Sequence, residues 1–523
     1  MTSLDLGVMA LYLLLVVGVT AYVALRQRTT DDYYVAGRSL GAGYIAASIL
    51  ATQVSAVSLI GGPAFVARGG GLVWLQYELA VPLATIALVA VVAPVLRRGA
   101  FVTIYDYAGQ RFGPTSRVAL ALVFLLARSL ASGVVLYAVS LPLAVAFGFP
   151  LGWTLLAIGG FSVLYTTVGG IRADVFTDVL QLVVLVVALL ICAVSAVDAL
   201  GGLGQALALV PADRTRALVL DQHGLGDGAT FAFWPMVLGG FFLYVSYYGF
   251  DQSQAQRLLA TRSVKAAQQA LVLNGLLRFP LAALYCFLGL LLAAWLAVDP
   301  QFGAAHLGER ADALVPHFLM EFAPAGIRGL FIAGLFAAAM STLDSSFNSL
   351  SAVTLRDVMG RTEEQARSLW LARGLSLLWG TFCTGSAFLF ARSSETVIES
   401  INRVGSLFYG PVLGLFVLGM LSRTTSERAG LAGLSAGLGS VAAVWWLFPQ
   451  VSWMWWNPLG FLVTCAIALL LAHWLPGPEV GPELVWRAAQ PVSEQRTLRR
   501  ATAGLLVAFV VLVVLSAALP SLL

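Results

Sequence analysis

Long apolar runs separated by short polar segments make up most of the chain. A helix needs about 20 apolar residues to cross a bilayer, and runs of this length recur along the whole sequence. The pattern therefore predicts an all-α polytopic membrane protein with about 14 transmembrane helices. The predicted helices cover residues 6–25, 44–66, 73–96, 118–147, 151–168, 174–197, 234–250, 270–298, 330–353, 368–391, 400–421, 429–448, 458–474 and 502–522.

The composition supports a membrane protein and excludes several other classes. Of the 523 residues, 59% are hydrophobic and 11% are charged, and the mean hydropathy is +0.88. A soluble domain of this length does not have such a composition. The net charge of +4 is modest and no basic tract is present, so we expect no nucleic-acid partner. The four cysteines lie in apolar runs without a C-x-x-C motif, which predicts neither a disulfide framework nor a metal site.

Loop charges predict the orientation of the chain. Basic residues are concentrated in the loops that lie inside if the N-terminus is outside, which is the side that the positive-inside rule assigns to them. We therefore expect a multi-pass protein of the cytoplasmic (inner) membrane with both termini outside. The first residues, MTSLD, lack a basic region, so we expect residues 6–25 to be a retained helix rather than a signal peptide.

Glycines interrupt two predicted helices at corresponding places. Gly61, Gly62 and Pro63 lie inside the second, and Gly239 and Gly240 lie inside the seventh. Interrupted segments in the two halves of a chain are typical of inverted-repeat transporters, whose binding site lies between the repeats. The predicted organisation is a leading helix and inner loop, a first repeat, an outer loop, a second repeat and three trailing helices, over residues 1–43, 44–197, 198–233, 234–421 and 422–523.

The ninth predicted helix is unusually polar in its second half. Ala338, Ser341 and Thr342 stand at i, i+3 and i+4, so a backbone carbonyl and two hydroxyls share one helical face. Oxygen ligands suit a hard cation, although small polar residues also form helix-packing faces. Asp344 favours the cation, because a carboxylate inside a membrane marks a functional site by default.

Six ionisable residues lie well inside predicted helices. They can form buried ion pairs that hold helices in register, or bind cations and substrate. The six are Glu78, Arg128, Asp178, Arg278, Asp344 and Arg403.

Four stretches together resemble the sodium:solute symporter family. They read ATQVSAVSLIGGP, GGIRADVFTDVLQ, YYGFDQSQAQR and AAAMSTLDSSFNSLS, and VGSLFYGPVLGLFVLGML adds to them. The resemblance implies a LeuT-type inverted repeat of five plus five core helices with extra helices at both ends. It also implies sodium (Na+) as the coupling ion and a small solute as substrate.

The resemblance also implies ion and substrate sites. The common sodium site of the family matches Ala51, Val54, Ala338, Ser341 and Thr342. A second cation site, present in some members, matches Asp178 and Ser345, with Asp344 in place of a serine; these acids could instead carry a proton. The predicted substrate-binding residues are Ser58, Tyr77, Glu78, Arg128, Tyr244, Tyr247, Tyr248, Arg278 and Arg403.

These observations predict a sodium-coupled symporter, working as a monomer, that imports a small polar organic solute by alternating access. The arginines favour a carboxylate, whereas Glu78 favours a hydroxyl or an amine. A sugar or polyol symporter, or a proton carrier using Asp178 and Asp344, stays open. A channel would need a pore-lining filter, and a membrane enzyme would need a cluster of histidines or carboxylates. The sequence shows neither, so we expect no enzymatic activity.

Overall fold

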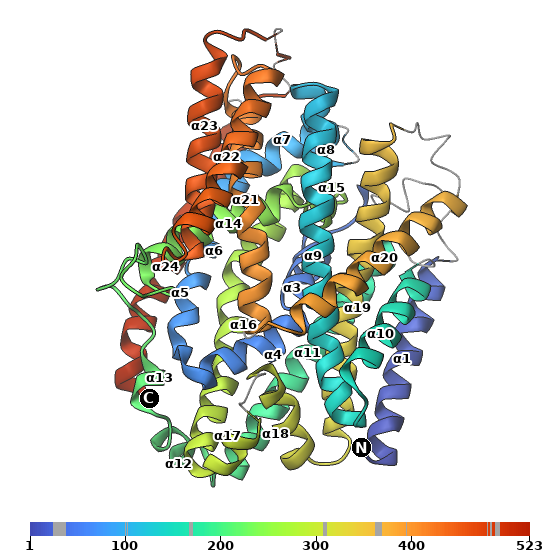
Figure 1. The fold of residues 1–523 in the computed structure, drawn as a ribbon, viewed down its shortest axis with the longest axis vertical. Coiled ribbons are helices and arrows are strands. Elements are labelled where there is room, and N and C mark those ends of the chain that lie inside the picture. Colours follow the sequence, from blue (N-terminus) through green and yellow to red (C-terminus); the bar gives the residue numbers. More distant parts are fainter. Residues whose placement is uncertain are drawn as a thin grey trace.

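The structure is a computed structural model. It describes residues 1–24, 38–99, 101, 103–166, 171–306, 311–360, 369–393, 395–477, 480–481, 484–486 and 492–523. Within these ranges the chain is helical, and its β structure is limited to two isolated bridges. Most long helices run roughly along the long axis of the molecule (Figure 1). Both chain ends lie in the lower half of that view, toward the end where α12 (Leu203–Ala208), α17 (Pro300–His306) and α18 (Leu314–Phe322) gather.

Every predicted membrane segment coincides with helical residues. Over the described ranges, nine helices are long and apolar enough to cross a membrane, so the count of fourteen stays a prediction. The helices in these segments are α1 (Ser3–Ala24), α3 (Ala42–Gln53), α4 (Ala56–Phe65), α5 (Leu75–Glu78), α6 (Ala80–Ala87), α7 (Ala93–Arg98), α9 (Pro114–Phe147), α10 (Leu151–Thr166), α11 (Ile171–Ala199), α14 (Phe233–Phe250), α16 (Val264–Val298), α19 (Ile327–Val353), α20 (Leu369–Phe390), α21 (Val397–Leu421), α22 (Glu427–Leu447), α23 (Trp456–Ala472) and α24 (Val492–Leu522).

The second predicted helix is broken, but not at its glycines. Helix α3 ends at Gln53, and α4 begins at Ala56 after Val54 leaves the helical conformation with ψ of 70°. The Ser55 side chain caps α4 by accepting a hydrogen bond from the Val57 N–H at 3.3 Å. The interruption predicted from Gly61, Gly62 and Pro63 is therefore wrong, because all three lie inside α4.

The seventh predicted helix shows the same correction. Helix α14 runs unbroken through Gly239 and Gly240 and ends at Phe250. The chain then turns at Asp251, whose carboxylate caps α15 (Gln252–Leu259) by accepting from the Ser253 N–H at 2.9 Å. Both halves of the chain thus contain a break that is capped by a short polar side chain.

The glycines allow close helix packing instead. A Cβ atom at Gly62 would lie 2.5 Å from the Tyr285 ring, and one at Gly239 would lie 2.2 Å from the Met454 carbonyl oxygen. Small residues let membrane helices approach each other closely, which explains why glycine occupies these positions without breaking the helix.

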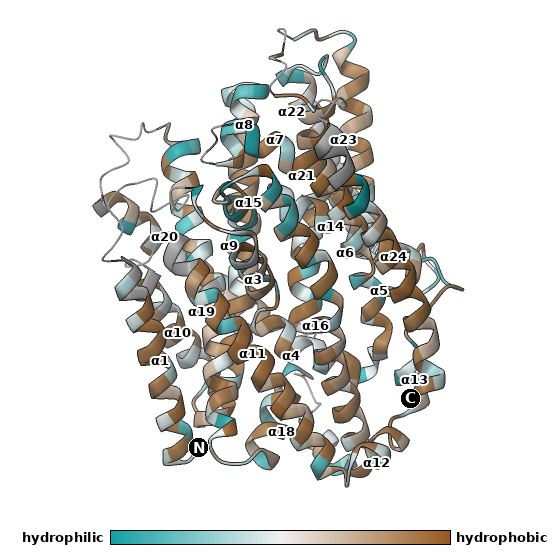
Figure 2. Ribbon diagram, turned by 180° about the vertical axis from the view of Figure 1, so that it is seen from behind, coloured by the Kyte–Doolittle hydropathy of each residue, from teal (hydrophilic) through white to brown (hydrophobic). Residues whose placement is uncertain are grey.

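Burial separates central helices from peripheral ones. The segment Ile327–Val358 contains α19 and its polar stretch. Of the 18 consecutive residues in it that qualify as membrane-spanning, 94% are buried. In the segment Leu498–Leu522 of α24, only 11% of the corresponding 18 residues are buried. Helix α24 is apolar over most of its length (Figure 2). Helix α24 therefore presents an apolar surface to lipid, whereas α19 packs among α3, α9, α11 and α20 in the interior.

The segment that precedes α18 is hydrogen-bonded to the start of α21. Asp312, in the short 3₁₀ helix Ala311–Ala313, accepts hydrogen bonds from the Val397 N–H at 3.1 and 3.3 Å. Burial, together with the nearby charge of Glu399, raises the pKa of the Asp312 carboxyl to about 7, against the opposing effects of the Val397 N–H and Arg68. The first helical N–H of α21, that of Val397, therefore donates to a carboxyl group whose pKa is raised to about 7.

This contact predicts a pH-dependent stability. The pKa of Asp312 is 3.8 in the unfolded chain and about 7 in the folded protein. At a pH between these two values the folded protein holds a proton at Asp312 that the unfolded chain releases. The free energy of unfolding therefore falls as the pH rises through this range. We expect the melting temperature to decrease from about pH 5 to about pH 8, and Asp312→Asn to flatten this decrease. Thermal unfolding across the range measures it, with the exposed-site variant Asp213→Asn as control. Superimposable profiles for wild type and Asp312→Asn would contradict the assignment.

Candidate functional site

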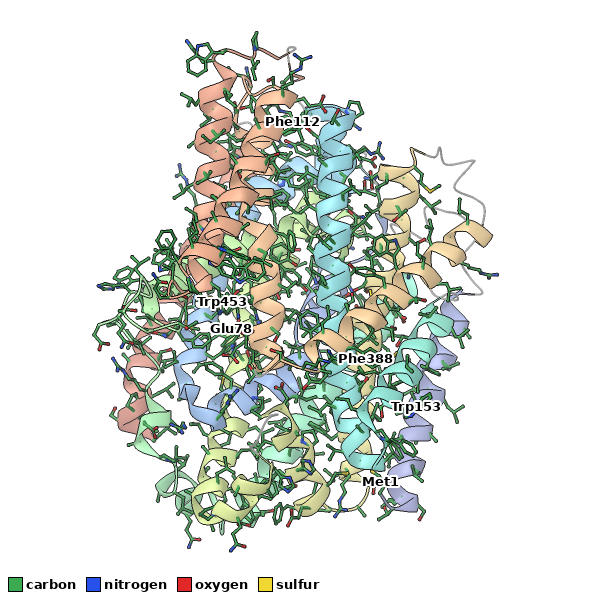
Figure 3. All side chains as sticks on the ribbon, in the orientation of Figure 1. Met1, Glu78, Phe112, Trp153, Phe388 and Trp453 are labelled. Carbon is green, nitrogen blue, oxygen red and sulfur yellow. The ribbon has the colours of Figure 1, made fainter. Side chains whose placement is uncertain are left out.

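A polar cavity lies near the middle of the molecule, between the two helix breaks. Its volume is about 90 Å³. Glu78, which lines it, lies near mid-height in Figure 3. Its polar lining includes Thr52, Gln53, Ser55, Ser58, Tyr77, Glu78, Arg128, Ser132, Tyr244, Tyr247, Arg278, Thr342, Asn402 and Tyr409.

Glu78 and Arg278 form a closed ion pair on one side of the cavity. The Nε atom of Arg278 donates to Oε2 of Glu78 at 2.9 Å, and its Nη2 atom donates to Oε1 at 2.8 Å. The hydroxyls of Tyr244 and Tyr285 donate to the same two oxygens at 3.1 and 3.2 Å. Four donors therefore satisfy this fully buried carboxylate, and the two charges neutralise each other.

Arg128 is bound more loosely. Its side chain is 5% exposed on α9, and its Nε atom donates to the Ser346 hydroxyl at 2.8 Å. Its Nη1 atom lies 3.8 Å from Oδ2 of Asp251, which is beyond hydrogen-bond distance. That oxygen already accepts from the Tyr409 hydroxyl at 3.2 Å. The Nη2 atom of Arg128 is buried without a hydrogen-bond partner among the described residues, so the cavity wall keeps a cationic donor available.

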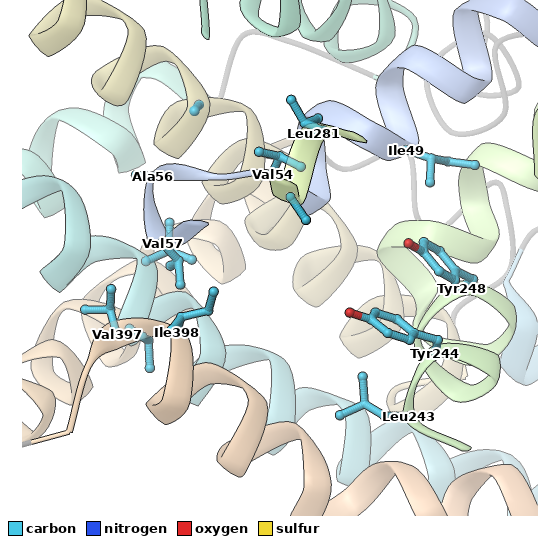
Figure 4. Close-up of a cluster of buried hydrophobic side chains, with 14 of the residues drawn as sticks. Ile49, Val54, Ala56, Val57, Leu243, Tyr244, Tyr248, Leu281, Val397 and Ile398 are labelled. Atoms are coloured by element: carbon cyan, nitrogen blue, oxygen red, sulfur yellow. The ribbon is translucent and has the colours of Figure 1, made fainter. Parts of the chain in front are cut away.

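Aromatic residues of α14 form another side of the site. Tyr77 and Tyr244 pack with ring centroids 5.0 Å apart, and the Tyr77 hydroxyl donates to Asn402 at 3.1 Å. Tyr248 stacks on Tyr244 at 5.8 Å, and the hydroxyls of both point the same way in Figure 4. The Tyr247 hydroxyl accepts from Gln254 at 2.9 Å, and Tyr247 contributes to the lining. Tyr248 is absent from the lining, and its hydroxyl donates to Gln53.

Oxygen atoms gather where α3 ends against α19. The Thr342 hydroxyl lies 3.1 Å from the Ala338 carbonyl oxygen and 3.5 Å from that of Thr52. The last N–H that donates back into α3 is that of Val54, to the Leu50 carbonyl at 2.8 Å. Because α3 stops at Gln53, no helical N–H follows to donate to the carbonyls beyond Leu50, starting with that of Ala51. These carbonyls and the Thr342 hydroxyl are neutral oxygen ligands of the kind that a monovalent cation needs. The side chain of Ser341 lies outside the described residues.

Two of the other predicted cation ligands, Asp178 and Ser345, already have a cation beside them. Asp178 on α11 and Ser345 on α19 both accept hydrogen bonds from Nη2 of Arg257, each at 3.0 Å. Asp344 precedes Ser345 on α19 and is buried. Over the described residues, no group of three or more His, Cys, Asp and Glu side chains could hold a metal ion.

Two predicted substrate residues are absent from the cavity lining: Tyr248, which packs on Tyr244, and Arg403, which lies at another pocket. Arg403 on α21 pairs with Glu395, and its guanidinium lies 5.8 Å from the Trp456 ring. It lines a separate pocket together with Trp445 and Glu399, and it is absent from the lining of the central cavity. Position along the sequence alone did not reveal this, because Arg403 and the cavity residue Asn402 are neighbours that face different ways.

The structure also adds residues that the sequence reasoning missed. Arg257 could have been noticed in the sequence, because it is the last residue of the motif YYGFDQSQAQR. Its contact with Asp178 could not, because that contact depends on the turn of the chain at Asp251. The other missed residues, which carry no charge and no distinctive spacing, are Thr52, Gln53, Ser132, Asn402 and Tyr409.

Two capped helix breaks beside a central polar cavity, in an all-helical membrane protein, define a secondary transporter of the LeuT fold class. A substrate-bound, outward-open Na+-coupled sialic acid symporter has this fold, with a TM-score of 0.79 at 22% identity over 91% of this chain and 99% of that one. Mhp1, a nucleobase-cation-symport-1 transporter, matches with a TM-score of 0.54 at 15% identity over 90% and 99% of the two chains.

The chain belongs to the sodium:solute symporter family, whose model matches residues 33–437. It is 31% identical to the sodium-coupled monocarboxylate transporter 2 of Bos taurus, over 83% of this chain and 71% of that protein. The sodium-dependent multivitamin transporter of Oryctolagus cuniculus is 31% identical over 84% and 70%. The human sodium/iodide cotransporter is 31% identical over 83% and 68%. The protein is thus a multi-pass membrane transporter that couples a small solute to sodium, as the sequence predicted.

The closed ion pair predicts a strong non-additive effect on stability. Removing one partner leaves the other charge buried and uncompensated, so Glu78→Gln and Arg278→Met should each cost about 3–5 kcal/mol. The double variant should be more stable than either single variant, because it leaves no unpaired charge. Thermal unfolding in one detergent checks this double-mutant cycle. Strictly additive effects would show that the two side chains do not act as a pair.

Proposed function

We propose that the protein is a sodium-coupled symporter that imports a small organic carboxylate across the cytoplasmic (inner) membrane by alternating access. The observation that carries this proposal is the buried Nη2 atom of Arg128, which lines the cavity without a hydrogen-bond partner in the described part of the chain. A solute carboxylate would accept from this guanidinium in a charge-assisted hydrogen bond.

The rest of the cavity fits an organic anion. Glu78 does not repel the anion strongly, because Arg278 and two tyrosine hydroxyls neutralise its charge. The Tyr244 and Tyr247 rings, with Leu243, offer apolar surface to the body of the solute. Two of the relatives are named for a carboxylate solute, the monocarboxylate transporter and the sialic acid symporter, which supports the same class here.

Sodium would bind where the broken helix α3 meets α19. We assign its ligands to the carbonyls of Ala51, Val54 and Ala338 and the hydroxyls of Ser341 and Thr342, in agreement with the neutral oxygens that converge there. Thr52 and Thr342 also line the solute cavity, so ion and solute share a wall. Each ligand would then favour the same conformation, and the coupling between them is reciprocal.

The sodium site gives a first functional prediction. Sodium, but not potassium, should raise the melting temperature of the purified protein, because a ligand that binds only the folded state stabilises it by mass action. Thr342→Ala should abolish this increase. Thr381→Ala is the matched control, since Thr381 is exposed on α20 and bonds to its own helix. If sodium has no effect on the wild type at any pH tested, coupling by protons through Asp178 and Asp344 becomes the preferred mechanism.

The anion site gives a second functional prediction. In proteoliposomes with an inward sodium gradient, the wild type should take up a small carboxylate such as pyruvate and discriminate against its neutral amide. Arg128→Gln should reduce this uptake by about 10- to 100-fold, which corresponds to the loss of a hydrogen bond to a charged group. The exposed Arg216→Gln variant should transport normally. Sodium-driven uptake of a neutral sugar or polyol that Arg128→Gln leaves unchanged would contradict the carboxylate assignment and favour the sugar or polyol alternative.

A further inference from the structure

Arg257 is a fully buried arginine that the solute cavity does not use. Its side chain has no exposed surface, and it extends from the short helix α15 into the interior. It belongs neither to the lining of the solute cavity nor to the predicted sodium ligands. A buried guanidinium must be paired and hydrogen-bonded to be tolerated, so its contacts indicate what it does.

The guanidinium contacts three helices of the transporter core. Its Nε atom donates to the Ser48 hydroxyl on α3 at 2.7 Å. Its Nη2 atom donates to Asp178 on α11 and to Ser345 on α19, each at 3.0 Å. Its Nη1 atom donates to the Ser253 carbonyl within α15. The Ser48 hydroxyl also donates to the Asp178 carboxylate. Every nitrogen of the guanidinium therefore has an oxygen partner.

The family resemblance implies a second cation at Asp178, Asp344 and Ser345, and in the structure Arg257 already donates to Asp178 and Ser345. These oxygens already surround a positive charge that the chain itself supplies. A sodium ion could enter only if the guanidinium withdrew, and that would strand a second buried charge with the Ser253 carbonyl as its remaining described partner. With the guanidinium in place, Asp178 and Ser345 do not fit a second free ion.

We propose that Arg257 is a tethered cation that takes the place of a second sodium ion, so that this chain binds a single sodium per transport cycle. The positive charge beside Asp178 is then permanent and does not depend on the sodium gradient. The inference deepens the proposed function and rests on it, because it assumes one sodium at the junction of α3 and α19. With a solute that carries one negative charge, such a cycle moves no net charge.

Removing the guanidinium should create the missing site. Without Arg257, the carboxylate of Asp178 and the hydroxyls of Ser48 and Ser345 would form a buried set of oxygen ligands with one negative charge, which is what a hard monovalent cation requires. The space left by the side chain would admit the ion. Lysine at this position would keep a positive charge beside Asp178 and should exclude sodium as arginine does.

The test counts sodium ions on the purified protein, in detergent and without solute, by equilibrium binding of radioactive ²²Na⁺. We expect one ion per chain for the wild type, two for Arg257→Ala and one for Arg257→Lys. The matched control Arg262→Gln removes an exposed arginine just beyond α15 and should keep one ion. Asp178→Asn should also keep one ion, because this carboxylate pairs with Arg257 rather than with sodium.

Each outcome decides between the assignments. Two ions on the wild type, loss of the ion in Asp178→Asn, or one ion on a folded Arg257→Ala would overturn the inference while leaving the proposed symport intact. No bound sodium on the wild type would refute the proposed sodium site, and this inference with it. If Arg257→Ala does not fold, the counts for the wild type and for Asp178→Asn still decide the question.

Discussion

The pairing of buried arginines with carboxylates is the constraint on which the rest of this structure depends. A charge taken out of water must be compensated by oppositely charged or hydrogen-bonding groups. Among the described residues, three arginine–carboxylate pairs have both side chains at most 5% exposed: Glu78–Arg278, Asp178–Arg257 and Asp251–Arg128. The first is closed by two parallel hydrogen bonds and two tyrosines, and serines complete the second. The third is loose, with 3.8 Å between the nearest charged atoms. Nη1 of Arg278 and Nη2 of Arg128 have no hydrogen-bond partner in the described structure, whereas every nitrogen of Arg257 has one. The closeness of the carboxylate thus distinguishes the closed pair at Arg278 from the proposed solute contact at Arg128.

The sequence was sufficient for the positions of the membrane helices but not for their breaks. The length of an apolar run is a local property that the bilayer thickness dictates, so helices such as α9 and α16 coincide with their predicted segments. A break depends on what caps it, and the capping residues were Ser55 and Asp251 rather than the glycines. Glycine in a membrane helix can allow close packing as readily as flexibility. The neighbouring helix shows which of the two applies: at Gly62, the closely packed Tyr285 ring shows that the glycine allows close packing.

The candidate site was predictable wherever a residue had chemistry that the membrane makes costly. Glu78, Arg128 and Arg278 stood out in the sequence as ionisable residues in apolar runs, and all three line the cavity. Arg403 met the same criterion, yet it lines a different pocket. Its neighbour on α21, Asn402, lines the central cavity, so the direction of the side chain rather than the position on the helix decides which pocket a residue lines. Which acid pairs with which arginine could not be predicted, since these contacts join residues that lie far apart in the chain.

Helix α15 connects the solute contact to the tethered cation. Its capping residue, Asp251, lies beside Arg128 and binds Tyr409, and Arg257 in its last turn reaches Asp178. A carboxylate on Arg128 would compete with Asp251 for that guanidinium, and any displacement of Asp251 would act on the first turn of a helix whose other end is fixed to α3, α11 and α19. The break in the second repeat therefore does more than open space for the solute. It places both ends of one short helix against charged groups, so that the proposed solute contact at one end is linked by direct contacts to α3 and α19, where we place the sodium site.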